Sequence, residues 1–191
     1  MRFGGGSPLS RNGGSRGLGF SFRHALIWLV GLGVSMLACQ TPSPPPKVSW
    51  VTPVRATDFV MQGDAARRAS MRLVVQGLDA DERKDFPSAR ASYERSIQVD
   101  ATNPWSYLAL ARYYLEQGEA QRVGPLLDQS AALFEAEGLR EPRVGVHLIG
   151  LRGGAYGSLG QDTEAQLYIE RAQTLAPLVW GDGQLQAGEL L

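Results

Sequence analysis

Two segments of this chain, 70–103 and 104–137, align with each other without a gap, and each is 34 residues long. A looser third copy restarts near Val146 and closes at Pro177. The recurring positions include Leu73, Gly77, Ala80, Ala89, Tyr93 and Ser96 in the first copy and Tyr107, Ala111, Tyr114, Val123, Leu127 and Ser130 in the second. Repeats of this length cover each other's apolar faces by stacking, so the period constrains the fold more than any other feature does.

Each copy predicts a helix, a turn and a second, antiparallel helix. Gly77, Ala111 and Gly153 lie in the first helices, where small side chains let the paired helix approach closely. Aromatic and aliphatic residues one turn away fill the space around them. An ordinary helical bundle whose spacing is coincidental is the alternative interpretation.

The repeats resemble the tetratricopeptide repeat (TPR), most closely in the stretches 107–118 and 159–172. The resemblance covers a little over half the chain. It implies an all-α fold of about three helix–turn–helix repeats (70–103, 104–137 and 146–177), forming a short right-handed solenoid. The chain departs from the family pattern at Lys84, which replaces the turn glycine, and at Val123, which replaces a small residue.

The repeat domain is expected to span 58–177. Asp58 or Asp64 is a candidate cap for its first helix. The fifth helix, near 142–159, contains five glycines, and we expect it to be the least stable of the six because glycine disfavours a helix. The last part, 178–191, contains Trp180 and a Gly-Asp-Gly break. It either folds back as a short cap or stays unstructured.

Residues 1–38 read as a secretory signal. The segment 1–24 is rich in Gly, Ser and Arg with no acidic residue, and 25–38 is uncharged and apolar. As a helix, these 14 apolar residues would span about 21 Å against a hydrocarbon core of ~30 Å. A stable transmembrane helix is therefore disfavoured.

The signal ends in Met-Leu-Ala-Cys at 36–39, which resembles a bacterial lipobox. The resemblance implies that Cys39 is acylated and becomes the first residue of the mature protein, and Gln40 suggests sorting to the outer membrane. An ordinary cleaved signal or an uncleaved anchor are the alternatives. Residues 39–57 are proline-rich and predict a linker, which could span roughly 50 Å in the polyproline conformation.

Charge and composition argue against several classes of function. The formal net charge is zero, but the first 38 residues hold four arginines, so the remainder has 15 basic (19 − 4) against 19 acidic residues. A nucleic-acid partner would need a basic face. One cysteine excludes an internal disulfide, and we expect no metal and no cofactor.

The sequence indicates no catalytic site. The stretch 150–157 resembles a phosphate loop only superficially, because no strand precedes it and the Lys-Ser/Thr ending is absent. We therefore expect that the protein is not an enzyme.

A TPR resemblance implies that the first helices line a concave, protein-binding groove. The predicted groove residues are Met71, Val74, Leu78, Trp105, Leu108, Arg112 and His147. Gly150 and Gly154 would leave room there for a partner backbone. The alternative for Trp105 is that it only packs on the neighbouring helix.

These observations favour a membrane-anchored lipoprotein that acts as a non-catalytic protein-binding scaffold or assembly factor in the cell envelope. Its partner would be an envelope protein or peptide in the groove, and it would face the periplasm from the outer membrane. Two alternatives remain: a self-associating periplasmic or inner-membrane-tethered structural subunit, and an accessory domain of an envelope enzyme complex.

Overall fold

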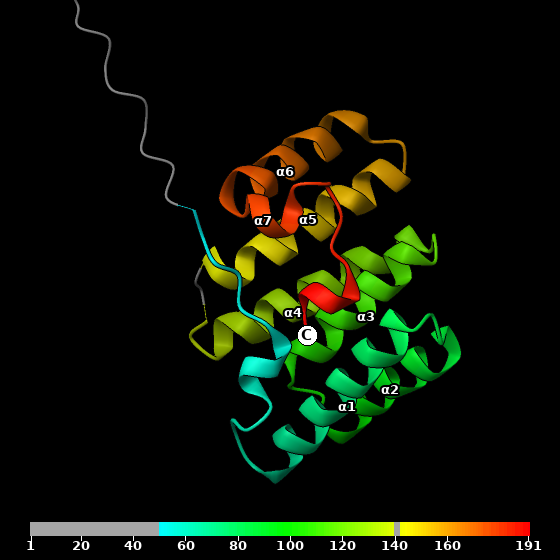
Figure 1. Cartoon of the computed structure of the whole chain (residues 1–191), viewed down its shortest axis with the longest axis vertical. Helices are drawn as coiled ribbons and strands as arrows, with labels where there is room; N and C mark the ends of the chain where they lie inside the picture. The colour runs from blue at the N-terminus through cyan, green and yellow to red at the C-terminus, as the bar shows by residue number, and fades with distance from the viewer. Residues whose placement is uncertain (1–49, 140–141) are drawn as a thin grey trace, which may run out of the picture. The chain divides into compact units, whose positions relative to one another are not determined.

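The computed structural model describes residues 50–139 and 142–191. Within these ranges the regular structure is helical, with no strand (Figure 1). The long helices are α1 (Ala65–Glu82), α2 (Phe86–Val99), α3 (Pro104–Glu116), α4 (Val123–Ala136), α5 (Pro142–Ser158) and α6 (Asp162–Leu175). The short ones are α7 (Pro177–Trp180) and the 3-10 turns η1 (Ala56–Phe59), η2 (Ala120–Arg122) and η3 (Ala187–Glu189). The all-α prediction is confirmed.

The long helices form three antiparallel pairs, α1/α2, α3/α4 and α5/α6, which stack in chain order (Figure 1). The predicted small residues allow the close approach within the pairs. A Cβ at Gly77 would overlap the Tyr93 ring on α2, and one at Gly153 would lie 3.0 Å from the backbone nitrogen of Ile169 on α6. Glycine is therefore required at these contacts.

Equivalent hydrogen bonds recur at the predicted repeat spacing. The Ser96 hydroxyl donates to the Ser70 carbonyl at 3.1 Å, and the Ser130 hydroxyl donates to the Pro104 carbonyl at 3.0 Å. Both atoms of the second bond lie 34 positions after those of the first. The register that the sequence predicted between the first two copies is therefore that of the structure.

The turns and caps follow local chemistry. Asp64 caps α1, because its Oδ1 accepts from the Arg67 amide at 2.8 Å. Lys84 has a positive φ of 63°, close to the 75° of Gly118 at the equivalent turn. The position thus needs the left-handed conformation that glycine adopts most easily, and Lys84 adopts it while pairing with Glu116 at 2.9 Å.

The folded unit is larger than the predicted 58–177 domain. The end of the predicted 39–57 linker is not a spacer: the Val51 amide donates to the Leu175 carbonyl at 2.8 Å, and Ala56 is fully buried. The physical reason is that apolar residues among the prolines reach uncovered apolar surface on the repeats. Residues 178–191 also fold back onto the repeats, so the cap alternative is correct.

The predicted signal at 1–38, Cys39 and linker residues 40–49 lie outside the described residues. In the part of the chain that the structure describes, no helix is both long and apolar enough to cross a bilayer.

Candidate protein-binding surface

The structure brings the predicted groove residues together on one side of α1, α3 and α5, but it buries all of them. Trp105 is 2% exposed, Arg112 is 3% exposed, and the other five, Met71, Val74, Leu78, Leu108 and His147, are fully buried. They lie on the first helices as predicted. The expectation that they line an open groove is wrong for this structure, because other parts of the chain cover them.

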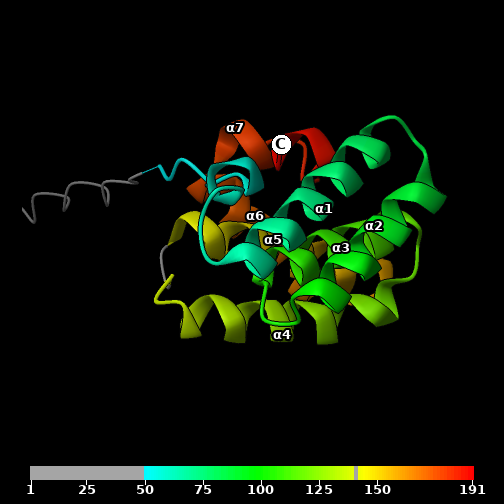
Figure 2. The ribbon, with the colours of Figure 1, turned by 90° about the horizontal axis from the view of Figure 1, so that it is seen from below.

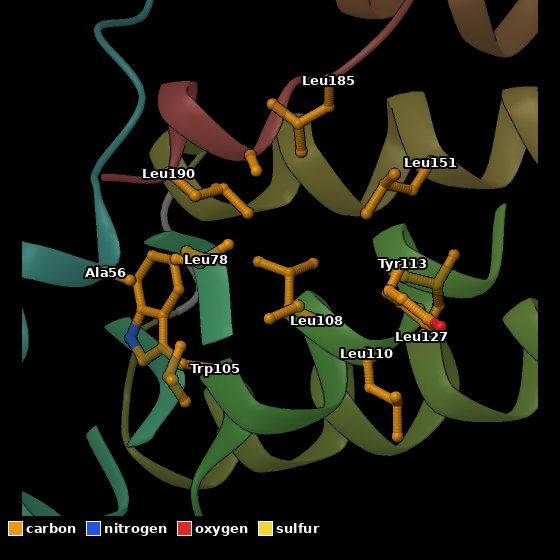
Figure 3. Close-up of a cluster of buried hydrophobic side chains, with 14 of the residues drawn as sticks. Ala56, Leu78, Trp105, Leu108, Leu110, Tyr113, Leu127, Leu151, Leu185 and Leu190 are labelled. Carbon is orange, nitrogen blue, oxygen red and sulfur yellow. The ribbon is translucent and has the colours of Figure 1, made fainter. Parts of the chain in front are cut away.

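Two segments cover this surface, which we term the concave face. The leading segment is residues 50–59 and the cover segment is residues 180–191. Both lie on the side of α3 and α5 that faces away from α4 (Figure 2). Leu185 and Leu190 of the cover segment point toward Leu108 of α3 (Figure 3). Both leucines are buried, so the cover segment contributes to the same core as the repeats.

The leading segment covers Trp105 and His147. The Phe59 ring lies 5.2 Å from the Trp105 ring, and the Phe134 ring of α4 packs on Trp105 at 5.3 Å. Trp105 therefore packs on a neighbouring helix, as the alternative interpretation held, and is also covered from outside. His147 Nε2 lies 3.1 Å from the Val54 carbonyl, which fixes the start of α5 to this segment.

Burial determines the protonation of His147. Desolvation lowers the pKa of this imidazole to about 4, and the hydrogen bond to Val54 only partly opposes that shift. His147 is therefore neutral at pH 7. Its Nδ1 is buried without a hydrogen-bond partner among the described residues.

Arg112 forms a buried ion pair beneath the cover segment. Its Nη2 pairs with Asp81 Oδ2, and the Tyr93 hydroxyl donates to the same oxygen at 3.1 Å. Nη1 pairs with Glu116 at 2.9 Å and donates to the Leu185 carbonyl at 3.4 Å. Burial opposes the charged form of Arg112, but the neighbouring Asp81, Tyr93 and Glu116 together outweigh it and raise the pKa of the guanidinium. Burial also disfavours the charged form of the Tyr93 phenol and therefore raises its pKa.

Three contacts hold the cover segment in place. The Trp180 ring occupies the notch at Gly150, where a Cβ would overlap it. The Gly188 amide donates to Glu82 Oε2 at 2.9 Å, and the Ala56 amide donates to the Leu190 carbonyl at 2.9 Å. The last bond ties the two covering segments to each other.

Part of the concave side remains open as a pocket of about 510 Å³. Its walls come from the end of α3, from α5 and α6, and from residues 183–186 of the cover segment. Its lining includes Leu115, Gly153, Gly154, Gly157, Ile169 and Gln184. The room predicted at Gly150 and Gly154 is filled by the chain's own Trp180 and Leu115 side chains, so that prediction is wrong for this structure. The wall formed by the cover segment carries no signal in the sequence.

Comparisons with known proteins agree with this architecture. The tetratricopeptide repeat family model matches residues 92–122. The N-terminal domain of stress-induced protein-1 from C. elegans superposes with a TM-score of 0.51 and 18% identity, covering 67% of this chain and 98% of that one. The described residues have a TPR fold.

Two further matches are more limited. The Arabidopsis OM64 TPR domain superposes with a TM-score of 0.49 and 22% identity, covering 59% of this chain and 87% of that domain. Cellulose synthase operon protein C of Pseudomonas fluorescens is 36% identical over 59 residues, which is 31% of this chain. That match spans only 5% of the length of the Pseudomonas protein.

Among the described residues, no group of His, Cys, Asp and Glu side chains is arranged to hold a metal ion. The pocket is lined by apolar side chains and by the glycines of α5.

Proposed function

We propose that this chain is a membrane-anchored TPR protein that binds a partner protein or peptide and performs no catalysis itself. One observation supports this function most: the open pocket continues the concave face, between α3, α5 and α6. A volume of about 510 Å³ lies within the roughly 300–1,000 Å³ range of ligand sites. Exposed, adaptable apolar surface of this kind is typical of peptide recognition.

The pocket favours a partner segment that carries an apolar side chain. Leu115 and Ile169 provide apolar contacts, and Gly157 leaves space for the partner's backbone. Polar groups at the rim, Glu116 and Gln184, can hydrogen-bond that backbone. An extended segment of a few residues therefore matches the pocket better than a bulky helix does.

We also propose that Cys39 is lipidated and tethers the domain to the periplasmic face of the outer membrane, on the lipobox resemblance alone. Several acyl chains give stable anchoring where a single one does not. Because residues 50–57 are part of the fold, only 40–49 remain as a spacer. Extended, that spacer reaches ~30 Å, less than the sequence had suggested.

Site-specific photo-crosslinking in cells tests the binding function. We expect a photoreactive amino acid at Ser158 or Gln184, both exposed at the pocket, to capture a partner. The matched control carries it at Arg95, an exposed position on α2. Equal capture at all three positions, or capture at Arg95 alone, would contradict a binding site in this pocket.

Metabolic labelling with palmitate tests the anchor separately. The natural chain should incorporate the label and the Cys39→Ser chain should not. Equal incorporation would exclude lipidation at this cysteine while leaving the binding function untouched.

A second candidate function is that of an accessory subunit in an envelope enzyme complex. The segment shared with cellulose synthase operon protein C favours it, since the name of that relative connects it with a synthase operon. Identification of the crosslinked partner by mass spectrometry separates the candidates: a polysaccharide synthase subunit would favour this second one.

A further inference from the structure

The concave face is buried by the chain's own cover segment, and the match between the two is apolar rather than polar. Leu185 and Leu190 fill the space above Leu108 (Figure 3). The polar contacts come from the backbone of the cover segment and include the bond from the Ala56 amide to the Leu190 carbonyl at 2.9 Å. The Leu185 carbonyl accepts from Arg112 at a long 3.4 Å, and the Gly188 amide reaches Glu82 at an exposed edge.

Five buried side-chain polar atoms of the described residues have no hydrogen-bond partner, and they are divided between the leading segment and the cover segment. They are Asp81 Oδ1, Trp105 Nε1, Arg112 Nε, His147 Nδ1 and Trp180 Nε1. Trp105 lies under Phe59, Arg112 contacts Leu185, and His147 contacts Val54. Trp180 is part of the cover segment itself, and Asp81 is the ion-pair partner of Arg112.

An unpaired buried donor or acceptor costs free energy, whereas apolar burial stabilises. The covering segments therefore bury the apolar part of the concave face and leave some of its polar atoms without a partner. Three of these atoms, Trp105 Nε1, Arg112 Nε and Trp180 Nε1, are obligatory N–H donors. At the cover segment, a polypeptide that presents a carbonyl oxygen to Arg112 Nε would satisfy this surface better.

The chain next to the cover segment has the features of a hinge. Gly181 and Gly183 follow Trp180, and Gly183 has a φ of 79°. These glycines supply the backbone freedom by which residues 183–191 can swing away while the repeats keep their stacking.

We propose that the cover segment is a built-in occupant of the binding surface, and that a partner displaces it with a segment of the same chemistry. That partner segment carries two leucine-sized side chains about five residues apart, as Leu185 and Leu190 are. The proposal rests on the proposed function and adds the chemistry of the partner and its competition with the cover segment.

A labelled peptide with the sequence of residues 181–191 tests this proposal on the full chain. Leu185→Ser together with Leu190→Ser should weaken the covering segment, so this double variant should bind the peptide at least tenfold more tightly than the natural chain. The matched control is Leu178→Ser, since Leu178 is 95% exposed. It should bind no more peptide than the natural chain, and a peptide carrying both serines should not bind the double variant. Equal binding by all three chains would overturn the proposal.

Hydrogen exchange on the natural chain decides the question even if the double variant does not fold. The amides of Gly188 and Leu190 should be at least tenfold less protected than those at the centre of α3, because the cover segment opens without the repeats. If these amides were as protected as those of α3, the cover segment would be a permanent part of the core, and the proposal would be overturned. So would a dimer in light scattering that exchanges these segments between copies.

Failure of this inference and failure of the proposed function give different results. If Ser158 crosslinks to a partner while the amides of the cover segment stay fully protected, the binding function is supported and the displacement of the cover segment is excluded. If the double variant binds the 181–191 peptide but no partner is crosslinked, the displacement of the cover segment is supported and the binding function is excluded.

Discussion

The two halves of the concave side are built from the same repeats and have different surfaces. In the covered half, α1, α3 and the start of α5 bury large side chains, among them Leu78, Trp105 and Leu108. In the open half, glycines of α5 line a pocket together with Leu115 and Ile169. One helical framework therefore provides core or binding surface, depending on whether another segment of the chain covers it.

The same contrast holds for charge. The Arg112–Asp81 pair in the covered half is buried, so its desolvation has to be offset by its own attraction and hydrogen bonds. The Arg152–Asp128 pair outside this half, at 2.6 Å, keeps Asp128 69% exposed. An exposed pair of this kind adds little to stability. Changes in the covered half should consequently have larger effects than changes in the open half.

The largest effect is expected from breaking the buried ion pair. Arg112→Met should lower the free energy of unfolding by about 3–5 kcal/mol, because it leaves the Asp81 carboxylate buried and unpaired. Urea denaturation measures this loss. The double variant Arg112→Met with Asp81→Leu is the control and should recover most of the loss. A single variant as stable as the natural chain would contradict this view of the pair.

The pH dependence of His147 should come next. Because its pKa is about 4 in the folded chain and about 6.5 unfolded, the unfolded chain binds the extra proton between these values. The stability from neutral His147 is fully present above pH ~6.5. It falls as the pH is lowered, by about 3 kcal/mol near pH 4. Urea denaturation at several pH values should show this component in the natural chain and not in His147→Gln.

The Gly150 notch should give a smaller effect. Gly150→Ala should destabilise by about 1–3 kcal/mol, since the added Cβ overlaps the Trp180 ring and displaces the cover segment. Gly145→Ala in the same helix is the matched control, because nothing lies within 4 Å of a Cβ there. It should be neutral or stabilising by up to ~1 kcal/mol. Tryptophan fluorescence with thermal unfolding measures both, and equal effects would argue against the notch.

The exposed face of α6 should tolerate change best. Leu167→Ser on α6 should alter the free energy of unfolding by less than about 0.5 kcal/mol, as an exposed side chain loses little packing. A loss of several kcal/mol, measured by urea denaturation, would mean that this face is not free.

Local and periodic features were predictable from the sequence. The Ser70 and Pro104 carbonyls accept equivalent bonds because the two copies share a register, and Gly77 and Gly153 face the paired helices as expected. All of these depend on neighbours within one repeat, or on the next repeat along the chain.

The covering of the concave face was not predictable. Trp180, Leu185 and Leu190 follow neither a helical nor a strand period, so no pattern assigned them to a face. The contacts that bury the predicted groove residues join distant parts of the chain, such as Val54 with His147 and Ala56 with Leu190. Periodicity shows which side of a helix is apolar, but not which part of the chain covers it.

Residue spacing and side-chain size act locally, and they specify the three helix pairs, their register and the helix faces that carry Trp105, Arg112 and His147. The covering of these faces by residues 50–59 and 180–191, and the pocket that stays open beside α5, depend on long-range packing. The reason is physical: apolar burial has no direction, so an apolar helix face is stabilised by any segment that can reach and fill it.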